Sequence, residues 1–127
     1  MQTFSCPEKG FKNEAEFTTW FWKQVKERWW FFHKISDYSL GFKPFDAICA
    51  LNGEVCAIEF KHIKWWSCTP FNLLRGSTPQ KPGTQVQSLE CFERNGWISK
   101  IIVYSEKSNR YITLNYSDEN LHSKVTI

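Results

Sequence analysis

Two apolar runs of β-prone residues, 45–51 and 54–60, meet at Asn52-Gly53 in the middle of the chain. This dipeptide readily supplies the two positive-φ residues of a type I′ turn, so the pattern predicts a two-residue β-hairpin. In such a hairpin Leu51 faces Glu54, and the numbers of every other facing pair also add up to 105. The register of the two strands is therefore predicted without further information.

This register sets Asp46 opposite Glu59, with their Cβ atoms about 5 Å apart on one face. Lys61 lies on the same face, roughly 7 Å further along the strand. Facing like charges destabilise a sheet, and an unpaired carboxylate among apolar neighbours costs several kcal/mol. Two interpretations stay open. Either Lys61 or solvent at the strand end neutralises the acids, or they bind a hard cation such as Mg²⁺, which takes one or two carboxylates and keeps several waters.

Around the hairpin, the hydrophobic pattern predicts two helices and three more strands. Asn13 is a good N-cap with Glu16 three residues later, which predicts a helix to about Arg28. A second helix is expected from Gln85 to about Asn95 and is ended by Gly96. Strands are expected at 29–35, 97–104 and 110–114, whereas 1–12 and 67–83 are expected to be irregular and the polar tail from Ser117 to fray. The order αβββαββ predicts one α/β domain over 1–127, a mixed sheet flanked by helices.

Each predicted helix carries a polar residue near its apolar face. The first has the stripe Phe17, Trp20, Phe21, Gln24 and Val25. Glu14 lies within about 60° of that stripe and Glu16 about 100° away, so Glu14 is expected to point toward the sheet, as a helix-dipole acid or as part of a site. Gln85 shares its inner face with Val86, Leu89 and Phe92, and a polar residue there needs a partner.

The acidic pair also carries a family resemblance. Pro44-Phe45-Asp46, a gap of twelve residues and Glu59-Phe60-Lys61 resemble the motif of the PD-(D/E)XK nucleases, with one residue inserted between Pro and Asp. More narrowly, the chain from about Asn13 to Tyr116 is similar to Holliday-junction resolvases of the archaeal and RecU types. This implies a restriction-endonuclease-like core. It also implies a first-helix glutamate at the metal, matched by Glu14, and a glutamine eleven residues before a glycine, matched by Gln85 and Gly96.

Composition adds little that is specific. Sixteen basic and thirteen acidic side chains give a net charge of +3, which permits DNA binding without demonstrating it. Five cysteines without a Cys-x-x-Cys pair favour neither a disulfide framework nor a zinc site and fit a reducing compartment. Cys49 and Cys56 are expected to face each other, as buried thiols or as a disulfide. We see no leader and no apolar run of 18 residues, so we expect a cytoplasmic protein that does not enter a membrane.

The function expected from these observations is a Mg²⁺-dependent DNA endonuclease that cleaves Holliday junctions, with Mn²⁺ able to replace Mg²⁺. Asp46 and Glu59 would hold the metal with Glu14 and the carbonyl of Phe60, while Lys61 stabilises the transition state and Gln85 supports it. The expected DNA contacts are Lys34, Ser36, Lys64, Trp65, Trp66, Arg75 and Lys81.

Three alternatives stay open: a restriction, repair or phage-associated nuclease of nicked, flapped or single-stranded DNA; a DNA-binding module without catalysis; and a structural protein with an ion-pair network. A homodimer is expected, because two symmetric nicks suit a twofold axis. Candidates for its apolar patch are Trp22, Trp29, Trp30, Trp65 and Trp66.

Overall fold

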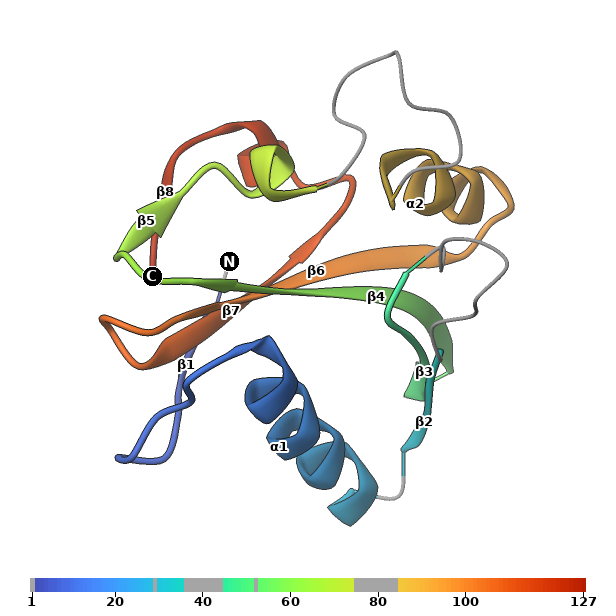
Figure 1. Cartoon of the computed structure of the whole chain (residues 1–127). Coiled ribbons are helices and arrows are strands. Elements are labelled where there is room, and N and C mark those ends of the chain that lie inside the picture. Colours follow the sequence, from blue (N-terminus) through green and yellow to red (C-terminus); the bar gives the residue numbers. More distant parts are fainter. Residues whose placement is uncertain (1, 29, 36–44, 52, 75–84) are drawn as a thin grey trace, which may run out of the picture.

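A six-stranded mixed sheet separates two helices in the computed structural model of the protein (Figure 1). The structure describes residues 2–28, 30–35, 45–51, 53–74 and 85–127. The main elements are β1 (Gln2–Ser5), α1 (Glu14–Glu27), β2 (Phe31–Lys34), β3 (Ala47–Leu51), β4 (Glu54–Ile63), α2 (Gln85–Arg94), β6 (Ile98–Ser105) and β7 (Arg110–Asn115). The strands lie in the order β1-β7-β6-β4-β3-β2, and of the neighbouring pairs among these described strands only β4 and β6 run parallel. The predicted α/β class, a mixed sheet flanked by helices, is confirmed, and the predicted elements occur in the order αβββαββ, to which the structure adds strands at both chain ends and after β4.

The hairpin forms in the predicted register. Leu51 pairs with Glu54 and Cys49 with Cys56. Gly53 has a φ of 80°, in the left-handed region that the turn requires. Asn52, the other turn residue, lies outside the described part of the chain. Cys49 and Cys56 are buried free thiols, so the thiol interpretation holds and the disulfide interpretation does not.

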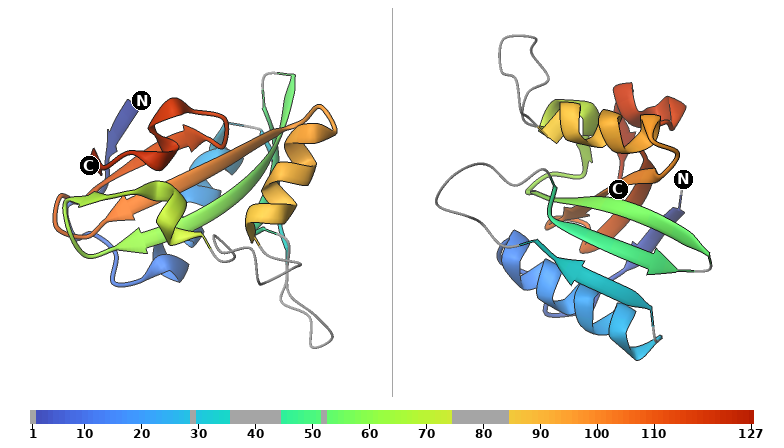
Figure 2. Two further views of the ribbon diagram at one scale, coloured as in Figure 1. Left: turned by 90° about the horizontal axis from the view of Figure 1, so that it is seen from above. Right: turned by 90° about the vertical axis from the view of Figure 1, so that its right-hand side faces the viewer.

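Helix α1 covers one face of the sheet, and Figure 2 shows α2 on the opposite face. The Asn13 side chain accepts a hydrogen bond from the Glu16 N–H at 2.9 Å, as an N-cap should. Phe17, fully buried, packs from α1 against Phe60 of β4 with ring centroids 6.0 Å apart. Leu89 of α2 is buried in a second apolar cluster, together with Ala57 of β4 and Val103 of β6. Alternate residues of β4 therefore pack into two apolar clusters, one under α1 and one under α2.

Both chain ends contradict the sequence prediction. Residues 2–5 form β1, which pairs antiparallel with the edge of β7 and stacks Phe4 on Tyr111 at 4.9 Å between centroids. The tail does not fray but forms η2 (Glu119–His122) and β8 (Val125–Thr126). Its apolar residues Leu121, Val125 and Ile127 are buried over the α2 face. Three such residues are too sparse to give a periodic pattern, so the sequence carried no signal for them.

The segment after the hairpin is also more regular than predicted. β4 continues to Ile63 because it pairs with β6 as far as Ser105. It is followed by β5 (Ser67–Cys68), which pairs with β8, and by η1 (Pro70–Leu73). The rest of the predicted loop, 75–83, lies outside the described residues. In the described part of the chain, no helix has the length and apolar character needed to cross a membrane.

Candidate active site

Two acidic side chains are buried at the junction of β3 and β4. Asp46 is 5% and Glu59 2% exposed. Glu59 lies in the middle of β4, between β3 and the parallel strand β6. On β4 it alternates with residues that face α1, so its side chain lies on the face covered by α2, whose first residue is Gln85. Buried carboxylates are rare unless they are paired or bind a cation, which makes this pair a candidate site.

Asp46 departs from the predicted register. The ladder ends at Ala47, which pairs with Ile58, and the Asp46 N–H also donates to the carbonyl of Ile58 at 3.0 Å. Two consecutive residues therefore face one, as in a β-bulge, a feature that re-aims side chains beside active sites. The Asp46 Oδ2 accepts from the backbone N–H of Phe60 at 2.8 Å. The bulge thus corrects the simple opposed pair, but the Asp46 carboxylate still lies beside Glu59.

Gln85 connects Glu59 to Lys61. Its Nε2 donates to Oε1 of Glu59 at 2.6 Å, and its Oε1 accepts from Lys61 Nζ at 3.1 Å. Lys61 Nζ also lies 3.6 Å from the same Glu59 oxygen. The buried amide therefore has the partner that the sequence required, and it holds the lysine and the acid in a fixed relation.

The other oxygen of Glu59, Oε2, is buried, and no hydrogen-bond donor reaches it in the described part of the structure. The pKa of Glu59 is raised to about 8, chiefly by burial and also by the charge and hydrogen bonding of Asp46, against the opposing effect of Lys61. A proton on Glu59 can be donated to Asp46, which relieves the repulsion between the two groups. Without a cation, Glu59 is thus mainly protonated at neutral pH.

The raised pKa predicts a stability profile for the metal-free protein. A carboxyl that binds its proton more tightly when folded stabilises the fold fully below the unfolded pKa, near 4.5, and loses this contribution as the pH rises through about 8. We expect the melting temperature in EDTA to fall between pH 5 and pH 8. In Glu59→Gln this part of the fall should disappear. An unchanged pH profile in the variant, measured by circular dichroism, would contradict the assignment.

The donor set fits a hard divalent cation. Two buried carboxylates supply oxygen ligands, and Glu59 Oε2 has no hydrogen-bond partner among the described residues, so it is available to a cation. Glu14, half-buried at the start of α1, is near enough that its charge raises the pKa of Glu59, as the smallest of the causes. Within the described ranges, however, no three Asp, Glu, His or Cys side chains gather as a metal site. The metal role of Glu14 stays a prediction, as does that of the Phe60 carbonyl.

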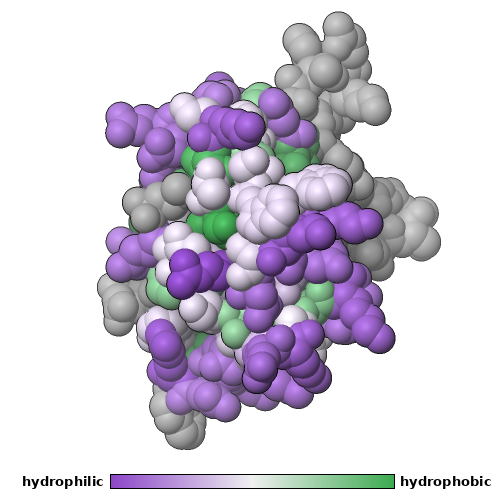
Figure 3. All heavy atoms as spheres, turned by 90° about the vertical axis from the view of Figure 1, so that its left-hand side faces the viewer, coloured by the Kyte–Doolittle hydropathy of each residue, from purple (hydrophilic) through white to green (hydrophobic). Residues whose placement is uncertain are grey.

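The predicted DNA contacts lie on several elements. Lys34 on β2 and Lys64 after β4 are exposed, and Trp65 and Trp66 are 60% and 53% exposed. Ser36, Arg75 and Lys81 fall outside the described residues. Seen from the end of the molecule where β4 leads to β5, the surface is largely hydrophilic, with pale side chains of intermediate hydropathy among the polar ones (Figure 3).

The tryptophans proposed for a dimer patch are not equivalent. Trp22 is 38% exposed, whereas Trp30 is half-buried and packs against the α1 core. Trp29 lies outside the described residues. Sequence reasoning also missed Lys107, whose Nζ lies 5.7 Å from the ring centroids of both Trp65 and Trp66. A single lysine in a predicted turn, some forty residues away in sequence, gives no signal of that contact.

Comparison with known proteins identifies the fold that carries this site. No family model matches the sequence, and no curated protein matches it. Among solved structures, the chain is similar to Hjc from Archaeoglobus fulgidus, a Holliday junction resolvase from an archaeal hyperthermophile, with a TM-score of 0.57. The chain shares the fold of that resolvase. The match covers 88% of this chain and 87% of Hjc at 14% identity, so the likeness to Hjc extends over most of both chains but shows the fold alone.

Proposed function

We propose that this protein is a metal-dependent DNA endonuclease of branched substrates, with the four-way junction as its first candidate and a homodimer as its active form. The observation that carries the proposal is the buried pair Asp46 and Glu59, with an unsatisfied Glu59 oxygen beside a fixed lysine. The fold shared with Hjc, itself a Holliday junction resolvase, supports the choice of substrate.

Each residue of the site has a definite task in this proposal. Asp46 and Glu59 would hold Mg²⁺ or Mn²⁺, with Glu14 and the Phe60 carbonyl as further oxygen donors. When bound, such an ion polarises a phosphate and lowers the pKa of a bound water. Lys61 is 16% exposed, so its ammonium can reach a phosphate oxygen and stabilise the charge that develops there. Gln85 is a positioning residue, because it touches Lys61 and Glu59 and can fix both.

The metal requirement gives the direct test. Cleavage of a labelled four-way junction should require Mg²⁺ or Mn²⁺, because the site offers hard oxygen ligands and no thiolate or imidazole cluster in the described ranges. Cleavage that persists in EDTA would refute the proposal.

Sedimentation at micromolar concentration measures the oligomeric state, and paired symmetric cuts in one junction are expected from a dimer.

A second substrate class is favoured by one observation. Trp65 and Trp66 are exposed side by side, with ring centroids 6.4 Å apart. Exposed aromatic side chains are typical of surfaces on which unpaired bases stack. DNA with a flap or a single-stranded arm is therefore the second candidate, and a panel of branched and linear substrates separates the two.

A further inference from the structure

Trp65 and Trp66 are the two most exposed tryptophans in the described part of the chain. They follow directly after β4, at the end of the sheet opposite the hairpin turn (Figure 1). Leaving two indole rings in water forgoes a large hydrophobic gain, so two adjacent exposed rings indicate a surface that something else covers.

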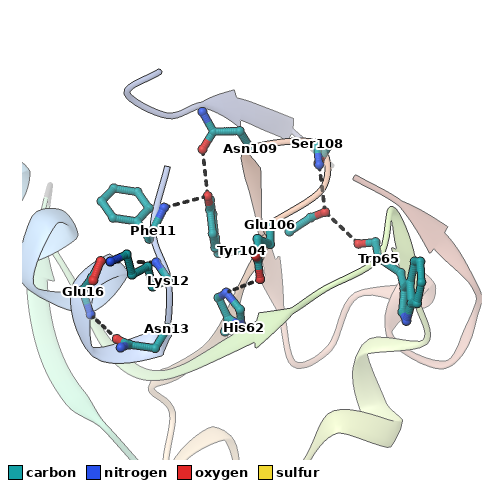
Figure 4. Close-up of polar contacts among 11 residues, drawn as sticks. Phe11, Lys12, Asn13, Glu16, His62, Trp65, Tyr104, Glu106, Ser108 and Asn109 are labelled. Carbon is teal, nitrogen blue, oxygen red and sulfur yellow. Dashed lines mark hydrogen bonds and ion pairs between the residues drawn. The ribbon is translucent and has the colours of Figure 1, made fainter. Parts of the chain in front are cut away.

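The backbone beneath these rings is held at several points. The carbonyl of Trp65 accepts from Ser105 Oγ at 2.7 Å, a contact drawn in Figure 4. The carbonyl of Trp66 accepts from the Ile127 N–H at 2.6 Å, and that of Lys64 from the Lys107 N–H at 3.2 Å. Ser105 is itself fully buried. The backbone that carries the two rings is therefore held in place, so it loses little conformational freedom when the rings bind a ligand.

The charge around the rings is positive. Lys107 Nζ lies 5.7 Å from each ring centroid, and Lys64 precedes the pair as a further exposed cation. Glu106, which directly precedes Lys107 in the chain, has its carboxylate 3.6 Å from His62 Nε2. Flat aromatic rings beside ammonium groups match a flat base attached to a phosphate.

We propose that Trp65, Trp66 and Lys107 form a stacking platform for unpaired nucleobases, so that the protein prefers DNA in which a single strand leaves a duplex. The platform follows the acidic site along the chain of β4. At about 3.3 Å per residue, the chain from Glu59 to Trp65 spans a length on the order of 15–20 Å. At about 3.4 Å per nucleotide this corresponds to roughly four to six nucleotides. If the protein is the proposed nuclease, on which this expectation rests, its cut should fall at this number of nucleotides from the stacked base.

The platform can be tested with and without catalysis. Binding of two labelled DNAs in EDTA is measured by fluorescence anisotropy: a splayed-arm DNA, and a blunt duplex with the same paired sequence. The Trp65→Ala/Trp66→Ala variant should lose about tenfold or more in affinity for the splayed arm, since a stacked base commonly contributes that much, and less than twofold for the duplex. The Trp65→Phe/Trp66→Phe variant should keep most of the affinity, because its rings still stack.

Trp97→Ala is the matched control. Trp97 is also exposed, at 47%, but it lies between α2 and β6 and its ring packs beside Phe92, with centroids 6.1 Å apart. It should leave both affinities unchanged. Equal losses on both DNAs in the double variant, or no loss, would overturn the proposal. So would a dimer that becomes a monomer in the double variant, because the rings would then cover a second copy of the chain.

The outcomes for the platform and for the nuclease can be told apart. If the wild-type protein cuts no DNA with Mg²⁺ but binds splayed arms through the two tryptophans, the platform stands and the nuclease proposal fails. If the wild-type protein nicks supercoiled DNA but shows no preference for splayed arms, and the double variant behaves in the same way, the nuclease proposal stands and the platform proposal is refuted.

Discussion

Glu59→Gln should abolish metal-dependent DNA cleavage and leave DNA binding intact. The amide keeps the size of the side chain but removes the charge that would hold a cation, while contacts to the DNA backbone come from other residues. Asp46→Asn should have the same effect. The measurement is cleavage of a four-way junction in Mg²⁺ beside binding of the same DNA in EDTA. These are the largest effects that we expect, a loss of activity to background.

Glu54→Gln is the control for these variants, because Glu54 carries the same side chain on the same strand β4 but is exposed. It should cleave at the wild-type rate. The active-site variants should also be at least as stable as the wild-type protein in metal-free buffer near pH 8, since they remove the repulsion between two buried carboxyl groups. A Glu59→Gln protein that cuts at a near wild-type rate would exclude Glu59 from the site.

Lys61→Ala should lower the cleavage rate by about 10² or more. The lysine bears a positive charge beside the site and is held by Gln85, so its loss removes a stabilising charge from the transition state without removing an oxygen ligand. Mg²⁺ affinity should therefore change little. Single-turnover rates at saturating Mg²⁺, together with a Mg²⁺ titration, separate these two effects.

Lys124→Ala is the control for Lys61→Ala, because Lys124 is an exposed lysine just before β8 that contributes nothing to the acidic site in this proposal. A Lys61→Ala protein that unfolds would instead support an ion-pair network whose task is structural, since a buried acid would then lack its partner. Mg²⁺-dependent thermal stabilisation in the variant would support the metal site.

Local patterns were enough to predict much of the site. The Asn-Gly turn fixed the pairing of Cys49 with Cys56, and thereby which residues of β4 share a face with Glu59. The spacing of Asn13 and Glu16 predicted the start of α1, and helical periodicity turned Gln85 toward the sheet. In each case the interaction that decides the structure acts between residues close in sequence, so it can be recognised from neighbouring positions of the chain.

The sequence by itself determined the class of fold, the hairpin register and the residues that could form the site. Only the tertiary structure decided how they meet: the bulge that turns Asp46 toward the Phe60 N–H, and the bridge of Gln85 between Glu59 and Lys61. It also decided the pairing of β1 with β7, the burial of the tail, and the position of Lys107 over two tryptophans. These depend on contacts between segments far apart in the chain, and no local pattern encodes the energy of such contacts.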